Sequence, residues 1–131
     1  MPRKLFFYLS FSMLIFAFAS CNKSDDNQIT ITFVSPTDNA VIANKSSVLI
    51  HVNFVASDEN HMVRVILHPD DNASNNIIDW NQHSHKKTIE FKQTVDLSSF
   101  PSGTKFHLEA IACADHDCAK EVEEDIFFSI Q

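Results

Sequence analysis

The chain contains a single glycine, Gly103, among its 131 residues. Nucleotide-binding loops need several glycines so that the backbone can approach a phosphate, and this scarcity therefore excludes the glycine-rich phosphate loops. Positive charge is also scarce, since 10 Lys and Arg stand against 17 Asp and Glu, which gives a formal net charge of −7. Nucleic-acid phosphates are bound mainly through positive charge, so the sequence predicts no nucleic-acid partner.

Helical periodicity is missing as well, whereas apolar and polar residues alternate in many short runs. Alternation with period two is typical of strands that bury one face. Polar turn clusters at residues 35–39 and 57–60 and a polar loop at 69–76 separate the runs. The pattern predicts an all-β domain, an antiparallel β-sandwich of about seven strands. The expected strands lie near residues 29–33, 48–55, 62–68, 77–80, 89–97, 106–112 and 122–130.

The segment from Val95 to Phe106 adds detail to this expectation. It runs Val-Asp-Leu, a turn, Gly103 and then the aromatic Phe106, and it resembles the corner between strands E and F of bacterial immunoglobulin-like and fibronectin-like modules. Residues 35–38, Ser-Pro-Thr-Asp, resemble the first strand of such modules. The resemblance implies an immunoglobulin-like sandwich over residues 29–130 and a positive φ at Gly103. It implies little about function, because this architecture serves many functions.

The first 20 residues are typical of an export signal. Arg3 and Lys4 precede an apolar run over residues 5–19, which at about 15 residues is short for a membrane-spanning helix. Phe18-Ala19-Ser20-Cys21 then resembles the lipobox of bacterial lipoproteins, in which the signal is cleaved before an acylated cysteine. The resemblance implies lipidation of Cys21 and stable attachment to a membrane through its acyl chains. An ordinary secretory signal with an incidental cysteine is the alternative.

Residues 22–27 are polar and lack large apolar side chains, so we expect a flexible tether. Lys23 and the acids Asp25 and Asp26 resemble the surface-export signal of Bacteroidota-type lipoproteins. The resemblance implies an outer-membrane lipoprotein exposed at the cell surface, and an anchor that faces the periplasm is the alternative. The expected organisation is a signal peptide at 1–20, a lipidated cysteine and tether at 21–27 and one immunoglobulin-like domain at 28–131.

Cys113 and Cys118 flank four residues at the tip of an expected hairpin. Export would place them in an oxidising compartment, so we expect a disulfide between them. Two alternatives remain open at this stage. Cys113, Cys118 and His116 have side chains that bind zinc, and the two cysteines could also remain free thiols.

All seven histidines fall between residues 51 and 116. In the motif His83-Ser84-His85, an extended backbone places both imidazoles on one face, where they can share a zinc or copper ion. His68 and His107 are expected on the outward faces of neighbouring antiparallel strand ends, where they would meet. The candidate metal ligands are therefore His68, His83, His85 and His107, and solvated surface histidines without a metal are the alternative.

The position of the His-x-His motif depends on residues 77–80. If they form a loop excursion, His83 and His85 stay near His68 and His107. If they form a strand, the chain returns to the opposite end of the sandwich, where His61 and His116 would be the neighbouring ligands. The order of these histidines, with one at a strand end, a His-x-His motif and then an aromatic residue before His107, resembles a family of immunoglobulin-like Bacteroidota-type lipoproteins of uncharacterised function.

No catalytic set stands out, because Ser98 and Ser99 occur in a turn without the setting of a nucleophile elbow. We therefore expect a non-catalytic cell-surface binding or accessory module rather than an enzyme. Zinc or copper, held by surface histidines, is its candidate cofactor, and its expected partners are the membrane and an unidentified surface ligand or protein. The alternatives are a small metal-dependent hydrolase and a structural or adhesion module without a small ligand.

Overall fold

The computed structural model describes residues 26–131, so the predicted signal and Cys21 lie outside the described residues. Between residues 26 and 131 the chain forms six strands and no helix, which confirms the prediction of an all-β fold. No helix within this range is long and apolar enough to cross a membrane. The strands are β1 (Ile29–Ser35), β2 (Ala40–Ile42), β3 (Val48–Pro69), β4 (Ile78–Val95), β5 (Lys105–Cys113) and β6 (Glu121–Ile130).

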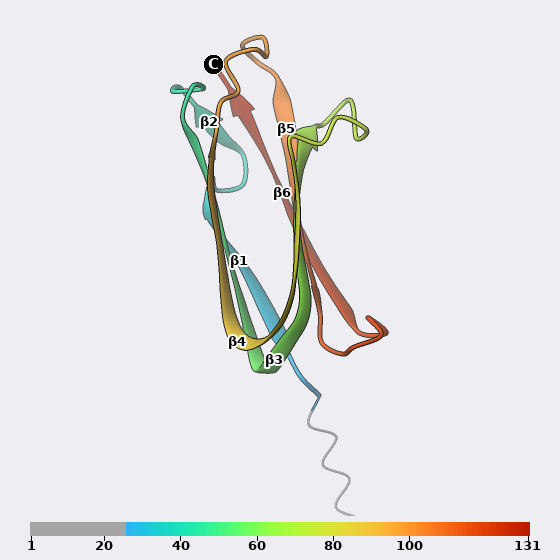
Figure 1. The fold of residues 1–131 in the computed structure, drawn as a ribbon. Helices are drawn as coiled ribbons and strands as arrows, with labels where there is room; N and C mark the ends of the chain where they lie inside the picture. Colours follow the sequence, from blue (N-terminus) through green and yellow to red (C-terminus); the bar gives the residue numbers. More distant parts are fainter. Residues whose placement is uncertain (1–25) are drawn as a thin grey trace, which may run out of the picture.

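Two long strands, β3 and β4, form an antiparallel hairpin along most of their lengths (Figure 1). Each takes the place of two expected strands, 48–55 and 62–68 in β3 and 77–80 and 89–97 in β4. The prediction that residues 57–60 end a strand is therefore wrong. Register shifts between Val55 and Asn60 and between Asn60 and Met62 bend the hairpin there without ending it, as β-bulges do.

The bent hairpin joins the two halves of the sheet. β1 pairs with the first half of β3, and β5 pairs with its second half, so that the strand order is β1-β3-β5-β6-β2 with β4 also on β3. The two halves face each other, and together they form one curled sheet where two separate sheets were expected (Figure 1). The sheet is mixed rather than purely antiparallel, because the short strand β2 runs parallel to β6.

Alternate residues of the strands fill the space between the two halves. In β3, every second side chain from Val48 to Phe54 and again from Val63 to Leu67 is buried, as period-two alternation requires. Gly103 has a φ of 89° in the turn before β5, which confirms the expected positive φ. Its N–H donates to the Ile130 carbonyl at 2.7 Å. The largest fully buried apolar side chains are Phe54, Phe106, Phe128, Ile50, Leu67, Leu97, Leu108 and Ile130.

We predict that Phe106→Ala lowers the free energy of unfolding by about 3–5 kcal/mol. Phe106 is fully buried and packs against Phe100 and Phe128, with ring centroids at 5.1 and 5.4 Å, so truncation leaves a cavity. Urea denaturation measures the change. Val41, which is 59% exposed on β2, supplies the control, since Val41→Ala should shift stability by less than about 0.5 kcal/mol. Equal effects of the two substitutions would contradict the assignment of the core.

Candidate metal centres

All histidines except His51 lie in two separate groups. The four-histidine cluster consists of His61, His83, His85 and His116 with Glu59, and the carboxylate–histidine cluster consists of His68, His107, Glu109 and Asp125. In the β3–β5 ladder the first lies beside the pair Met62 and Cys113 and the second at the pair His68 and His107. At roughly 3.3 Å per residue this places them roughly 20 Å apart.

This arrangement decides between the two alternatives left by the sequence. Residues 78–80 belong to β4, which carries His83 and His85 along β3 towards His61 and His116. The candidate ligands His68, His83, His85 and His107 therefore do not form one site. His68 and His107 do meet, as cross-strand partners with ring centroids 5.1 Å apart.

The bend of the hairpin positions His61 and His85. Asn60 pairs with Lys86 and Met62 pairs with His83, so His61 and His85 lie in the irregular stretch between these two pairs. Asn60 is fully buried and secures the bend, because its side-chain Nδ2 donates to the carbonyls of Lys86 and Lys87, both at 2.9 Å. Regular pairing would give each residue one cross-strand partner, whereas the bulged backbone re-aims side chains.

Within the four-histidine cluster, one ligand atom each from His61, His85 and His116 lies within 4.8 Å of the others. The Nε2 atoms of His83 and His85 are 3.2 Å apart. His61 is 8% exposed, and its Nδ1 is buried without a hydrogen-bond partner among the described residues. Such a nitrogen is costly to bury unsatisfied, so it is available as a ligand.

Glu59 connects two of these imidazoles. Its Oε1 lies 3.4 Å from His61 Nε2 and its Oε2 lies 3.3 Å from His85 Nδ1. A carboxylate on one ring nitrogen orients the ring and raises the basicity of the other nitrogen. The nitrogens turned away from Glu59 are His61 Nδ1, which has no hydrogen-bond partner among the described residues, and His85 Nε2, which lies beside His83 Nε2, and these are the candidate metal ligands.

His116 belongs to the loop between β5 and β6, which a disulfide closes. Cys113 and Cys118 are bonded, with their Cα atoms 4.9 Å apart, as the sequence predicted. For so short a loop the entropy model assigns about 2 kcal/mol of stabilisation. The Asp115 side chain also accepts hydrogen bonds from the N–H groups of Ala119 and Lys120 at 2.8 and 3.4 Å. The disulfide and these hydrogen bonds restrain the backbone of the loop, and therefore the position of the His116 Cα atom.

Asn27 ties this loop to the bend of β3. Its Nδ2 donates to the Glu59 carbonyl at 2.5 Å and to the Ala114 carbonyl at 3.1 Å. Asn27, close to the start of the described residues, therefore links β3, which carries Glu59, to the loop that carries His116. The bend of β3 and β4 lies next to the start of β1, at the bottom of Figure 1. The four-histidine cluster therefore lies at this end of the molecule.

The carboxylate–histidine cluster spans three strands. His68 on β3 donates from Nδ1 to the Pro69 carbonyl at 2.8 Å, and its Nε2 lies 3.1 Å from Glu109 Oε1. His107 on β5 has Nδ1 3.0 Å from the same oxygen and Nε2 2.8 Å from Asp125 Oδ2 on β6. One carboxylate oxygen therefore faces two imidazoles.

His68 is 5% exposed, although the alternation of β3 predicts an outward side chain. The ring of His107 and the carboxylate of Glu109 cover it. Burial alone lowers the pKa of His68, but the hydrogen bond to Pro69 and the hydrogen bond and charge of Glu109 outweigh burial, so the pKa is raised. His107 in turn stacks on Phe127, with ring centroids 4.4 Å apart.

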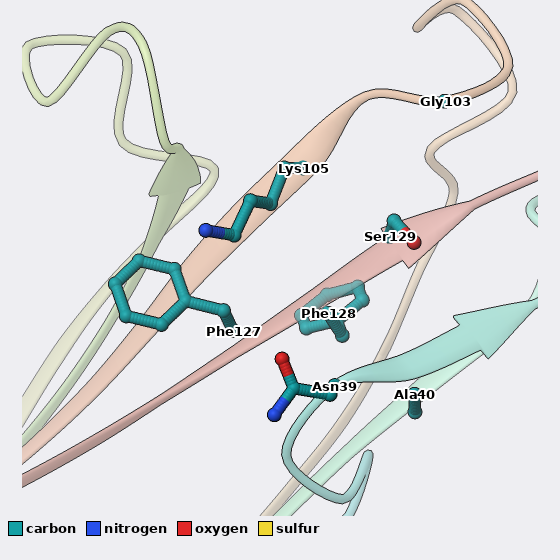
Figure 2. A pocket seen from close by; sticks show the side chains of 7 residues that line it. All are labelled: Asn39, Ala40, Gly103, Lys105, Phe127, Phe128 and Ser129. Atoms are coloured by element: carbon teal, nitrogen blue, oxygen red, sulfur yellow. The ribbon is translucent and has the colours of Figure 1, made fainter.

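A small hollow lies beside the carboxylate–histidine cluster, and its lining includes Phe127, on which His107 stacks. Its volume is about 220 Å³, and Lys105 Nζ lies 4.2 Å from the centre of the Phe127 ring (Figure 2). Ligand pockets for drug-sized molecules hold roughly 300–1,000 Å³. The hollow suits a small group at most, and the metal-binding side chains are the stronger chemical feature of the described residues.

No protein-family model and no curated protein matches the chain.

The carboxylates Glu59, Glu109 and Asp125 are absent from the residues predicted from the sequence. Glu109 could have been found, because it is two residues after His107 on an extended strand and must share its face. Asp125 becomes a neighbour only through the pairing of β5 with β6, where it lies opposite Glu109. Glu59 lies in the stretch that the sequence assigns to a turn.

We predict that the metal-free protein loses stability as the pH rises through the pKa of folded His68. A raised pKa means that the folded state binds the proton more tightly, so this contribution is complete below the unfolded pKa of about 6.5 and disappears above the folded pKa. Urea denaturation between about pH 6 and 8 measures the decline, which His68→Gln should reduce. Identical slopes for the variant and the wild type would contradict the raised pKa.

Proposed function

We propose that this protein is a non-catalytic, lipid-anchored surface module that binds zinc or copper at the four-histidine cluster. The observation that carries the proposal is the convergence of His61, His85 and His116 within 4.8 Å, with His83 beside His85. Imidazole suits zinc and copper, and neutral imidazole is abundant near pH 7.

The geometry agrees with a tetrahedral ion. With zinc–nitrogen bonds of about 2.0–2.1 Å, two ligand nitrogens lie roughly 3.3–3.4 Å apart. The Nε2 atoms of His83 and His85 are already 3.2 Å apart. The side chains of His85 and His116 are exposed, and one ligand atom of each lies within 4.8 Å of one of the buried His61, so small side-chain rotations bring them onto one ion.

The surroundings favour a cation. The chain carries a formal net charge of −7, and an acidic field raises the local concentration of cations. Glu59 lies 3.4 and 3.3 Å from one nitrogen of His61 and of His85, a placement that suits the carboxylate–histidine–metal arrangement that typically raises metal affinity. Charge, donors and orientation therefore point to the same ligand.

A lipid at Cys21 would place this cluster close to a membrane. Asn27 contacts the elements that carry Glu59 and His116, and the chain between residues 21 and 27 spans at most roughly 20 Å. The metal would then be held near the bilayer surface, as suits an accessory module of the outer membrane.

We predict that zinc raises the thermal midpoint of the protein purified in detergent. A ligand that binds only the folded state stabilises by about 2.7 kcal/mol at 100 times its Kd, which is on the order of 10 °C for a domain of this size. Replacing both His83 and His85 with alanine removes two of the four ligands, so the four-histidine cluster should no longer hold its zinc ion and the stoichiometry should fall by one. Calorimetric titration and thermal unfolding measure both effects.

His51→Ala is the matched control, because His51 contacts Glu90 and lies outside both clusters. This variant should keep the full response to zinc. If the His83→Ala, His85→Ala protein binds zinc with the affinity and stoichiometry of the wild type, the four-histidine cluster is not the site.

We predict that the mature protein begins at an acylated Cys21. Mass spectrometry of the N-terminal peptide should show the mass of a diacylglyceryl cysteine, and Cys21→Ser should release the protein from membranes because single weak contacts do not replace acyl chains. An unmodified N-terminus at another residue would contradict the anchor and leave the metal site untouched.

A further inference from the structure

The carboxylate–histidine cluster has more hydrogen-bond acceptors than donors. Each of the four ring nitrogens of His68 and His107 lies 2.8 to 3.1 Å from an oxygen. A neutral imidazole carries one N–H group, so two neutral rings can satisfy only two of these four contacts. The other two contacts bring a nitrogen lone pair against an oxygen.

The outer contacts select which nitrogens carry hydrogen. The Pro69 carbonyl can only accept, so the His68 Nδ1 carries a hydrogen, and in the neutral ring its Nε2 presents a lone pair. Asp125 likewise takes the hydrogen of His107 Nε2 at 2.8 Å, which leaves a lone pair on Nδ1. Both nitrogens without a hydrogen then lie close to the same oxygen of Glu109, at 3.1 and 3.0 Å.

A cation resolves this conflict. Three potential ligand atoms, one each from His68, His107 and Glu109, lie within 4.8 Å of one another. The remaining ring nitrogens are already held by an oxygen acceptor, which is how proteins orient metal-binding histidines. The geometry points to a second, independent site for a divalent cation, with His68 Nε2, His107 Nδ1 and the Glu109 carboxylate as its ligands.

This site goes beyond the proposed function, because it shares no residue with the four-histidine cluster. Its donors are two imidazoles and a carboxylate, a set that suits zinc. Three protein ligands leave at least one position of a four-coordinate zinc ion to water or an outside ligand. His107 and Glu109 are each 20% exposed at the side chain, so solvent reaches this position.

The test uses zinc and the full-length protein in detergent, in a background that carries His83→Ala and His85→Ala. This background should still bind a single zinc ion, and adding Glu109→Gln should abolish that binding. Asp125→Asn should weaken it by about 10- to 100-fold, because Asp125 holds His107 without binding the metal. Glu90→Gln is the matched control, since Glu90 faces His51 outside both clusters and its loss should leave affinity unchanged.

Imidazole nitrogen NMR gives a second readout that a merely structural role would not produce. On adding zinc, His68 should keep hydrogen on Nδ1 and His107 should keep hydrogen on Nε2, so the two rings adopt opposite tautomers. Rings that stay doubly protonated with zinc present would show that protons, not a metal, fill the two positions, and would overturn the proposal. Absence of zinc binding in the double-alanine background would overturn it as well.

The same variants distinguish failure of the second site from failure of the proposed function. Glu109→Gln alone should leave the zinc ion of the four-histidine cluster in place. A chain that loses all zinc through Glu109→Gln but none through His83→Ala and His85→Ala would reject the proposed function and retain the second site. The reverse result would reject the second site only.

Discussion

The bend in the β3–β4 hairpin is the constraint on which the rest of the structure depends. Both strands run from one half of the curled sheet into the other, so the bend brings the two halves face to face over the core. Asn60 holds the bend through two backbone carbonyls of β4, in a position that is fully buried. The irregular pairing that Asn60 stabilises also positions His61 and His85, so the same bend determines both the fold and the candidate site.

Much of the fold is predictable because burial obeys a period of two. The alternating apolar residues of β3, β5 and β6 point into the core as expected, and the turn at Gly103 has the backbone conformation that only glycine adopts readily. The continuity of β3 could not be predicted. Residues 57–60 are polar and resemble a turn, yet a bulge keeps them in the strand, and bulges depend on long-range pairing that composition does not reveal.

The candidate sites follow the same division. The meeting of His68 and His107 is predictable, because it requires only that two neighbouring strands run antiparallel and end together. The place of His83 and His85 is not, because it depends on whether residues 78–80 pair with β3. The carboxylates were missed for a different reason. With 17 acidic residues in the chain, composition alone cannot single out Glu59 or Asp125 until the pairing of strands is known.

The two clusters differ in how strongly the protein prepares them. In the four-histidine cluster only His61 is buried, and the exposed rings of His83, His85 and His116 must lose rotational freedom on binding, which costs free energy. In the carboxylate–histidine cluster the sheet itself fixes His68, and a carbonyl and a carboxylate hold the rings before any ion arrives. Rings that are already held in place, as in the carboxylate–histidine cluster, lose less entropy when a metal binds. The exposed rings of the four-histidine cluster can instead adapt to more than one coordination geometry. The second cluster should therefore discriminate more sharply among metals, whereas the first should accept zinc and copper with less distinction.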